Sequence, residues 1–160
     1  MKNVFIGIGS NLGDRQGYID LAKLRLGELP QTTLTGFSAV YETEPVGPIE
    51  QGAYLNAAAQ LDTQLSPGEL LGELAGIEQQ TGRPGVEQRV KWGPRTLDLD
   101  ILMYGDLVLS ENDLMIPHPK MHERDFALRP LADMDAQAVH PVLQMTIEEL
   151  LKRNQQQTND

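Results

Sequence analysis

The stretch that most constrains this chain runs over residues 91–104, with the sequence KWGPRTLDLDILMY. In its second half, three apolar residues alternate with Asp98 and Asp100, which is the period of a half-buried β-strand. The two carboxylates therefore share one face, about 7 Å apart by the rise of a strand. Such a pair disfavours joint ionisation unless a cation lies between its members, and hard carboxylate oxygens suit Mg²⁺. The pattern predicts a magnesium-binding face; the alternative is the solvated face of an edge strand.

Two further features precede this strand. Arg95 offers a guanidinium to an anion, and Trp92, the only tryptophan of the chain, offers a flat surface for stacking. Taken singly, each residue is more often part of packing or of the surface. Their conjunction with the two aspartates favours a site that binds a metal, an anion and a flat ring.

Length and composition set the broad class. A chain of 160 residues without cysteine predicts a single domain over 1–160, with no disulfide framework and no thiol chemistry. We find no basic and apolar leader and no apolar run that approaches the length of a membrane span. We therefore expect a cytoplasmic protein that binds no membrane.

The charge is strongly acidic but unevenly distributed. A net charge of −10 argues against nucleic-acid binding, which needs a basic face. Four cations nevertheless fall close together with a single acid, Glu87, among them: Arg83, Arg89, Lys91 and Arg95. Lys120 and Arg124 form a second basic pair. These segments could attract a small polyanion, or they could be solvated loops.

The predicted elements alternate in a recognisable order. The first half contains a strand over 4–9, a helix over 15–29 capped by Asp14, a strand over 33–41, a long loop over 42–53, a strand over 54–62 and a helix from the Ser66 capping box to Thr81. The aspartate-bearing strand follows, with a hairpin turn at 105–106 that returns through 107–109. The chain then has a short helix over 124–133, a helix from the Thr146 capping box to Arg153 and a polar tail over 154–160. This order matches the α+β, ferredoxin-like βαββαβ arrangement. We expect an antiparallel sheet with helices on one face, and the other face left for loops and ligand.

Several polar or small residues allow two interpretations. Asn56 could read the edge of a heterocycle or bond the backbone at a strand start. Glu78 could be a rim residue or an acceptor that faces the site, and His118, between two prolines, could be a turn residue. Gly9 could mark a close approach of the backbone to another group, or a strand end.

These residues together resemble one family. Residues 91–102 resemble the defining motif of the 6-hydroxymethyl-7,8-dihydropterin pyrophosphokinases of folate biosynthesis. Further matching segments follow in the order and spacing of that family: GIGSNLG at 7–13, YET at 41–43, GP at 47–48, YLNA at 54–57, and Pro117-His118 with Arg124 and Phe126. The resemblance covers roughly residues 3–150.

The resemblance implies a reaction. The β,γ-pyrophosphoryl group of ATP would move to the hydroxymethyl oxygen of the pterin, giving AMP and the pterin diphosphate. ATP would be the co-substrate and Mg²⁺, as two ions, the metal. The partners would be small molecules only, with no nucleic acid and no membrane, and the protein would be a monomer.

The resemblance also assigns roles to residues of this chain. Asp98 and Asp100 would hold the metal, and the catalytic group would comprise Arg83, Lys91, Arg95, Asp98 and Asp100. The nucleotide would contact Glu78, Arg83, Lys91, Arg95, Ile101, His118 and Arg124. The pterin pocket would comprise Gly9, Thr43, Val46, Tyr54, Asn56, Trp92 and Phe126.

The chain departs from the family pattern at Glu44, Ala75, Lys91 and Pro119, which bears on loop dynamics and adenine contacts and not on the reaction. Two other classes stay open. One is a two-metal phosphohydrolase that uses the same aspartate pair, although such enzymes need more metal ligands. The other is a non-catalytic nucleotide-binding module.

Overall fold

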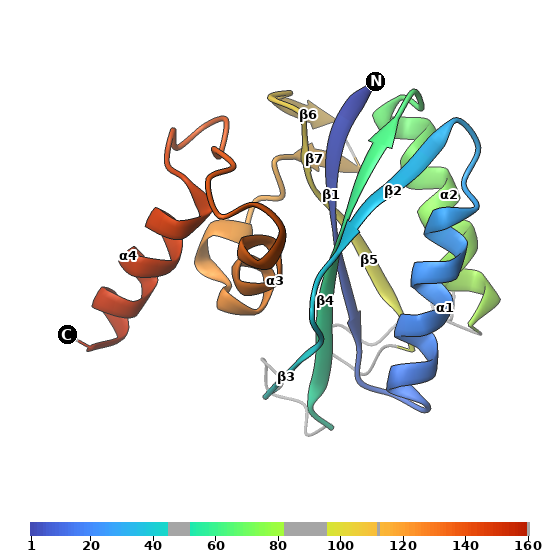
Figure 1. The fold of residues 1–160 in the computed structure, drawn as a ribbon, viewed down its shortest axis with the longest axis horizontal. Helices are drawn as coiled ribbons and strands as arrows, with labels where there is room; N and C mark the ends of the chain where they lie inside the picture. The colour runs from blue at the N-terminus through green and yellow to red at the C-terminus, as the bar shows by residue number, and fades with distance from the viewer. Residues whose placement is uncertain (45–51, 82–95, 112, 160) are drawn as a thin grey trace.

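The structure, a computed structural model, describes residues 1–44, 52–81, 96–111 and 113–159. A five-stranded antiparallel sheet lies at the centre, with α1 (Arg15–Gly27) and α2 (Pro67–Gln80) on one face (Figure 1). On the other side lie α3 (Asp125–Asp135) and α4 (Ile147–Asn159). The fold is the ferredoxin-like arrangement that the sequence predicts.

The strands follow the expected order along the chain. They are β1 (Lys2–Ser10), β2 (Thr32–Phe37), β3 (Tyr41–Thr43), β4 (Tyr54–Thr63), β5 (Asp98–Tyr104), β6 (Leu109–Glu111) and β7 (Leu114–Ile116). The main sheet runs β2-β4-β1-β5, with β3 also paired to β4, and β6 and β7 form a separate two-stranded sheet. A 3₁₀ turn, η2 (Met121–Glu123), precedes α3. Gly9 and Asn56 are paired on the two central strands, at the end of the sheet where β5 begins with Asp98.

Three predicted helix starts are confirmed. The Asp14 side chain accepts a hydrogen bond from the Gly17 amide at 3.1 Å. Ser66 and Glu69 form a reciprocal capping box, which satisfies amide groups that have no partner within the helix. Thr146 and Glu149 form the same pair of bonds at the start of α4. Local side-chain chemistry therefore sets where these helices begin.

Alternation along the central strands creates two cores. Ala57, Ala59 and Leu61 of β4 belong to the core under α1 and α2, as the sequence predicts. Ala58 points the other way and packs with Leu128 of α3 in a second core. From the sequence we expected loops and ligand on that second face, whereas α3 covers part of it and α4 packs against α3.

The predicted strand over 33–41 is in fact two strands, β2 and β3. Between them the Ser38 amide still donates to the Ala58 carbonyl at 2.9 Å, but the Ser38 hydroxyl, in place of a backbone carbonyl, accepts from the Ala58 amide at 2.8 Å. The Ala39 amide donates to the carboxylate of Asp133 in α3, at 3.3 Å. These side-chain bonds interrupt the regular pairing with β4 that a continuous strand over 33–41 would have.

Two other predictions are wrong. Residues 107–109 do not return along β5, because β6 pairs with β7 instead. We expected a polar tail after Arg153, but α4 continues to Asn159, and its Asn154 amide donates to the His122 carbonyl and the Asp125 carboxylate. Bonds to η2 and α3 thus extend the helix beyond the predicted end at Arg153.

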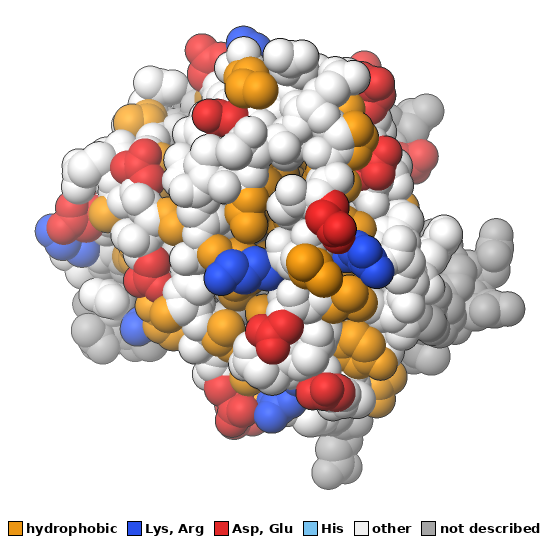
Figure 2. All heavy atoms as spheres, turned by 45° about the vertical axis from the view of Figure 1, so that its right-hand side comes forward, with side chains coloured by type: hydrophobic (Ala, Val, Ile, Leu, Met, Phe, Trp, Pro, Cys, Tyr) orange, Lys and Arg blue, Asp and Glu red, His pale blue; other side chains and the backbone are white. Residues whose placement is uncertain are grey.

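The molecular surface carries charges of both signs. Figure 2 shows the molecule turned so that the α1 and α2 side comes forward, and its Lys and Arg side chains lie scattered among Asp and Glu. A nucleic-acid backbone needs a gathered basic face, which the described residues on this view do not form. Within the described ranges, no helix has both the length and the apolar character that a bilayer span needs.

Candidate active site

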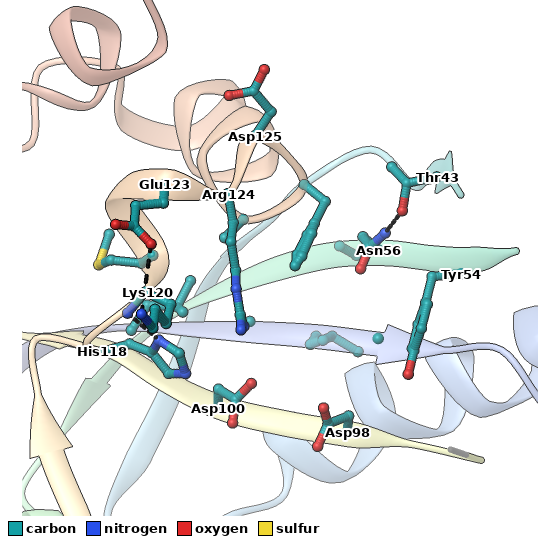
Figure 3. A pocket seen from close by; sticks show the side chains of 18 of the residues that line it. Thr43, Tyr54, Asn56, Asp98, Asp100, His118, Lys120, Glu123, Arg124 and Asp125 are labelled. Carbon is teal, nitrogen blue, oxygen red and sulfur yellow. Dashed lines mark hydrogen bonds and ion pairs between the residues drawn. The ribbon is translucent and has the colours of Figure 1, made fainter. Parts of the chain in front are cut away.

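A cavity of about 730 Å³ lies against the sheet face opposite α1 and α2, beside η2 and the start of α3 (Figure 3). The structure brings together nine of the residues that the sequence singled out. They are Gly9, Thr43, Tyr54, Asn56, Asp98, Asp100, His118, Arg124 and Phe126. These residues come from β1, β3, β4, β5 and the segment from Ile116 to α3, so the cavity joins both halves of the chain.

Asp98 and Asp100 project from β5 into this cavity on the same side (Figure 3). They pair in register with Gly9 and Gly7 of β1, so no β1 side chain stands beside either carboxylate. Leu99, between them, is buried in the helix-side core. The shared acidic face that the alternation predicts is confirmed.

The donor set suits magnesium bound together with phosphates. Within the described ranges, no group of three or more acidic, His or Cys side chains forms a complete metal cage. Two carboxylates that leave the other positions to water and phosphate oxygens match the usual coordination of Mg²⁺. Asp98 and Asp100 therefore fit a metal that arrives with a phosphorylated substrate.

His118 is held as a neutral ring. Its Nδ1 accepts a hydrogen bond from the Lys120 amide at 3.1 Å, which leaves the ring proton on Nε2. Burial and, to a smaller extent, the Arg124 charge lower the pKa of His118 to about 4, although the Asp98 carboxylate opposes the shift. His118 can therefore donate a hydrogen bond at neutral pH without carrying a charge.

Arg124 extends from the start of α3 toward the sheet, on the side to which Asp100 projects (Figure 3). Its guanidinium carbon lies 5.4 Å from the centre of the Phe126 ring, within the range of a cation–π contact. The cation is thereby held between an aromatic ring and the acidic face. This arrangement suits an anion that bridges Arg124 and a metal on the aspartates.

One wall of the cavity is built from β3 and β4. The Asn56 amide donates to the Thr43 hydroxyl at 2.6 Å, and Asn56 is only 9% exposed. A Cβ placed on Gly9 would lie 3.5 Å from Oδ1 of Asn56 and from the Tyr54 ring. The glycine thus leaves room in front of polar and aromatic groups, as a flat ligand requires.

Glu78 and Ile101 do not line the cavity. The buried Glu78 carboxylate accepts from the Leu99 amide at 2.8 Å, so Glu78 is an acceptor and not a solvated rim residue. It binds β5 at the residue between the two aspartates. The Ile101 side chain lies in the helix-side core, turned away from the aspartates.

Some predicted site residues lie outside the described residues: Val46, Arg83, Lys91, Trp92 and Arg95. Other cavity residues were not assigned from the sequence: Gly7, Ile8, Glu44, Ala57, Leu102, Lys120, Met121, Glu123, Asp125 and Ala127. Two of these residues could have been assigned to the site from sequence features. Gly7 shares a strand face with Gly9, and Lys120 belongs to the second basic pair.

Comparison with known proteins gives a consistent family. The model of the family 7,8-dihydro-6-hydroxymethylpterin-pyrophosphokinase (HPPK) matches residues 5–136. The chain is 43% identical, over 135 residues, to the 2-amino-4-hydroxy-6-hydroxymethyldihydropteridine pyrophosphokinase of Bacillus subtilis, covering 84% of this chain and 79% of the relative. The protein of the same name from Aquifex aeolicus is 38% identical over 154 residues, 96% of this chain and 93% of the relative.

Among solved structures, the chain resembles the crystal structure of Plasmodium falciparum HPPK-DHPS with pterin and p-hydroxybenzoate, with a TM-score of 0.76. The identity is 17%, and the match covers 99% of this chain and 45% of that longer one, so it supports the fold alone. The family assignment rests on the sequence matches, which extend over most of the chain. The chain therefore belongs to the 7,8-dihydro-6-hydroxymethylpterin-pyrophosphokinase family.

Proposed function

We propose that this pyrophosphokinase transfers the β,γ-pyrophosphoryl group of ATP to the hydroxymethyl oxygen of 6-hydroxymethyl-7,8-dihydropterin, with Mg²⁺, and releases AMP and the pterin diphosphate. One observation carries the proposal beyond the family match. Asp98 and Asp100 project into the same cavity that Tyr54, Asn56 and Phe126 line. A metal site for phosphates and a slot for a flat ring would therefore adjoin each other.

At the phosphate side, Asp98 and Asp100 would hold magnesium on the triphosphate. The metal would neutralise phosphate charge and align the β-phosphorus for in-line attack. Arg124 would bind a phosphate as a cation, and His118 would donate its Nε2 proton as a neutral group. The phosphate or nucleotide contacts of Arg83, Lys91 and Arg95 stay predictions, as do nucleotide contacts of Glu78 and Ile101.

At the pterin side, Phe126 offers a ring for stacking, and Gly9 leaves the space that a flat heterocycle needs. With its amide nitrogen bonded to Thr43, Asn56 retains its carbonyl oxygen to accept an N–H from the pterin edge. Val46 and Trp92 would complete this pocket. Small molecules are the proposed partners, and a monomer stays the expected state.

Nδ1 of His118 is not available as a general base, because it already accepts a hydrogen bond from the Lys120 amide. Rate enhancement would then come mainly from holding the two substrates in line and from electrostatic stabilisation by the metal and cations.

Product analysis tests the proposal. The protein is incubated with Mg-ATP, with and without 6-hydroxymethyl-7,8-dihydropterin, and the nucleotide and pterin products are separated. We expect AMP and pterin diphosphate in equal amounts, formed only when the pterin is present. Orthophosphate without pterin would instead support the two-metal phosphohydrolase, and nucleotide binding without turnover would support the binding module.

A further inference from the structure

The strand β3 is a short element that carries a cavity residue. It pairs with β4 at only three positions, Tyr41 with Asn56, Glu42 with Leu55 and Thr43 with Tyr54. Thr43 lines the cavity and accepts the Asn56 amide. So few ladder bonds leave the placement of an edge strand dependent on other contacts.

Arg15, at the first position of α1, supplies such contacts from the other side of the sheet. Its Nη1 donates to the Ala53 carbonyl at 2.9 Å and lies 3.2 Å from Oε2 of Glu42. Ala53 directly precedes Tyr54, and Glu42 directly precedes Thr43. One guanidinium therefore binds the neighbours of two residues that line the cavity.

Alternation explains how this contact reaches the cavity. Glu42 pairs with Leu55, which packs against the helix-side core, whereas Thr43 pairs with Tyr54 on the cavity side. Neighbouring residues of a strand point to opposite faces, so a bond that fixes Glu42 also fixes the direction of Thr43.

The Arg15 bonds contribute little to overall stability. The Arg15 and Glu42 side chains are 33% and 60% exposed, and solvent screens ion pairs at such positions. The bond to the Ala53 carbonyl is partly buried and directional. We therefore expect the loss of these Arg15 bonds to change the positions of the cavity-wall residues more than the free energy of unfolding.

We propose that Arg15 is a positioning residue for the pterin end of the site, acting through Thr43 and Tyr54 without touching substrate. This inference rests on the proposed function. Arg15→Ala is expected to raise the Kd and KM for the pterin about fivefold, because Thr43 and Tyr54 must then be ordered when the pterin binds. The KM for ATP and kcat should stay within about twofold of the wild type, because the acidic face on β5 has no contact with Arg15 among those described.

Three further variants sharpen the test. Arg15→Lys keeps a charge beside Glu42 but loses the planar fork, so a smaller rise in pterin Kd is expected. Glu42→Gln keeps the bond to Ala53 and should change pterin Kd less than Arg15→Ala. Arg25→Ala is the matched control, because Arg25 lies on the same helix and pairs with Glu28 at 3.1 Å, away from the cavity.

The measurements are pterin binding by titration calorimetry, steady-state kinetics for both substrates, and melting temperature. A pterin Kd that rises in Arg15→Ala but not in Arg25→Ala, with the conservative variant between them, supports the inference. If the wild type transfers pyrophosphate while Arg15→Ala matches Arg25→Ala in pterin Kd and KM, the inference fails alone. If the wild type forms no AMP with the pterin, the proposed function and this inference fail together.

Discussion

Asp98 and Asp100 owe their shared face to the residues beside them. Leu99 and Ile101 are both 4% exposed and lie in the helix-side core. A slip of β5 by one residue would expose both apolar side chains and bury both carboxylates, at a large cost in free energy. The hydrophobic pattern that forms the strand therefore also fixes the direction of the two acids.

At the same scale, His118 leads to a prediction on pH. Its pKa of about 4 is below the ordinary value of 6.5, so the ring of the free protein protonates only in more acidic solution. The profile of kcat/KM for ATP, which reports the free enzyme, should then show no inflection near pH 6.5 caused by His118. Parallel profiles for the wild type and His118→Gln are expected between pH 6 and 8. An inflection present in the wild type and lost in the variant would contradict the assigned neutral state.

At the scale of elements, the Glu78 side chain connects the helix α2 to the strand β5 by accepting a hydrogen bond from the Leu99 amide. Glu78→Ala leaves that buried amide without its acceptor, so the free energy of unfolding should fall by about 1–3 kcal/mol. Turnover should fall as well, because the amide lies between the two aspartates. The measurement is urea denaturation beside steady-state kinetics.

Glu78→Gln is the matched control for this prediction. Its amide oxygen can still accept from Leu99, so it should retain most of the stability that Glu78→Ala loses. Equal losses in both variants would show that the carboxylate acts by its charge and not by holding β5.

Elements with local signals could be predicted from the sequence. The caps at Asp14, Ser66 and Thr146 act through neighbouring residues, and the faces of β4 follow from alternation. The break between β2 and β3 depends instead on Asp133, which is far away in sequence. The pairing of β6 with β7 and the extension of α4 likewise depend on partners that no local pattern reveals.

At the scale of the molecule, the cavity exists because α3 covers only part of the second sheet face. Tyr41 of β3 donates to the Asp133 carboxylate of α3 at 2.8 Å, which ties the two walls together. Motif residues such as Asn56 and Phe126 could be assigned to this site from their resemblance to a family. Glu123 and Asp125 were missed because their place depends on how η2 and α3 dock on the sheet.

A buried histidine in the C-terminal half, His140, should make the free energy of unfolding decrease in acid. His140 is buried, and its Nδ1 accepts from the Val142 and Leu143 amides. Burial lowers the pKa of His140, and the nearby charges of His122 and Arg153 lower it further. The unfolded chain therefore binds a proton first as the pH falls below 6.5, and the free energy of unfolding declines from that point.

Denaturation of the wild type and His140→Gln at several pH values tests this sign. The variant, although less stable at pH 7 through loss of the two amide bonds, should lose less further stability between pH 7 and 5 than the wild type. Because the lowered pKa of His118 acts in the same direction, part of the decline should remain. An equal decline in both proteins would contradict the assigned contribution of His140.

The proposed transfer depends most on the metal that Asp98 and Asp100 would hold. The direct measurement is the affinity for Mn²⁺, by electron paramagnetic resonance, with a non-hydrolysable ATP analogue bound to the wild type, Asp98→Asn and Asp100→Asn. Asp106→Asn serves as the control, because Asp106 is exposed in the turn after β5 and does not line the cavity. The account predicts that each cavity variant loses about tenfold or more in metal affinity while the control matches the wild type. Undiminished metal affinity in Asp98→Asn and Asp100→Asn would contradict it.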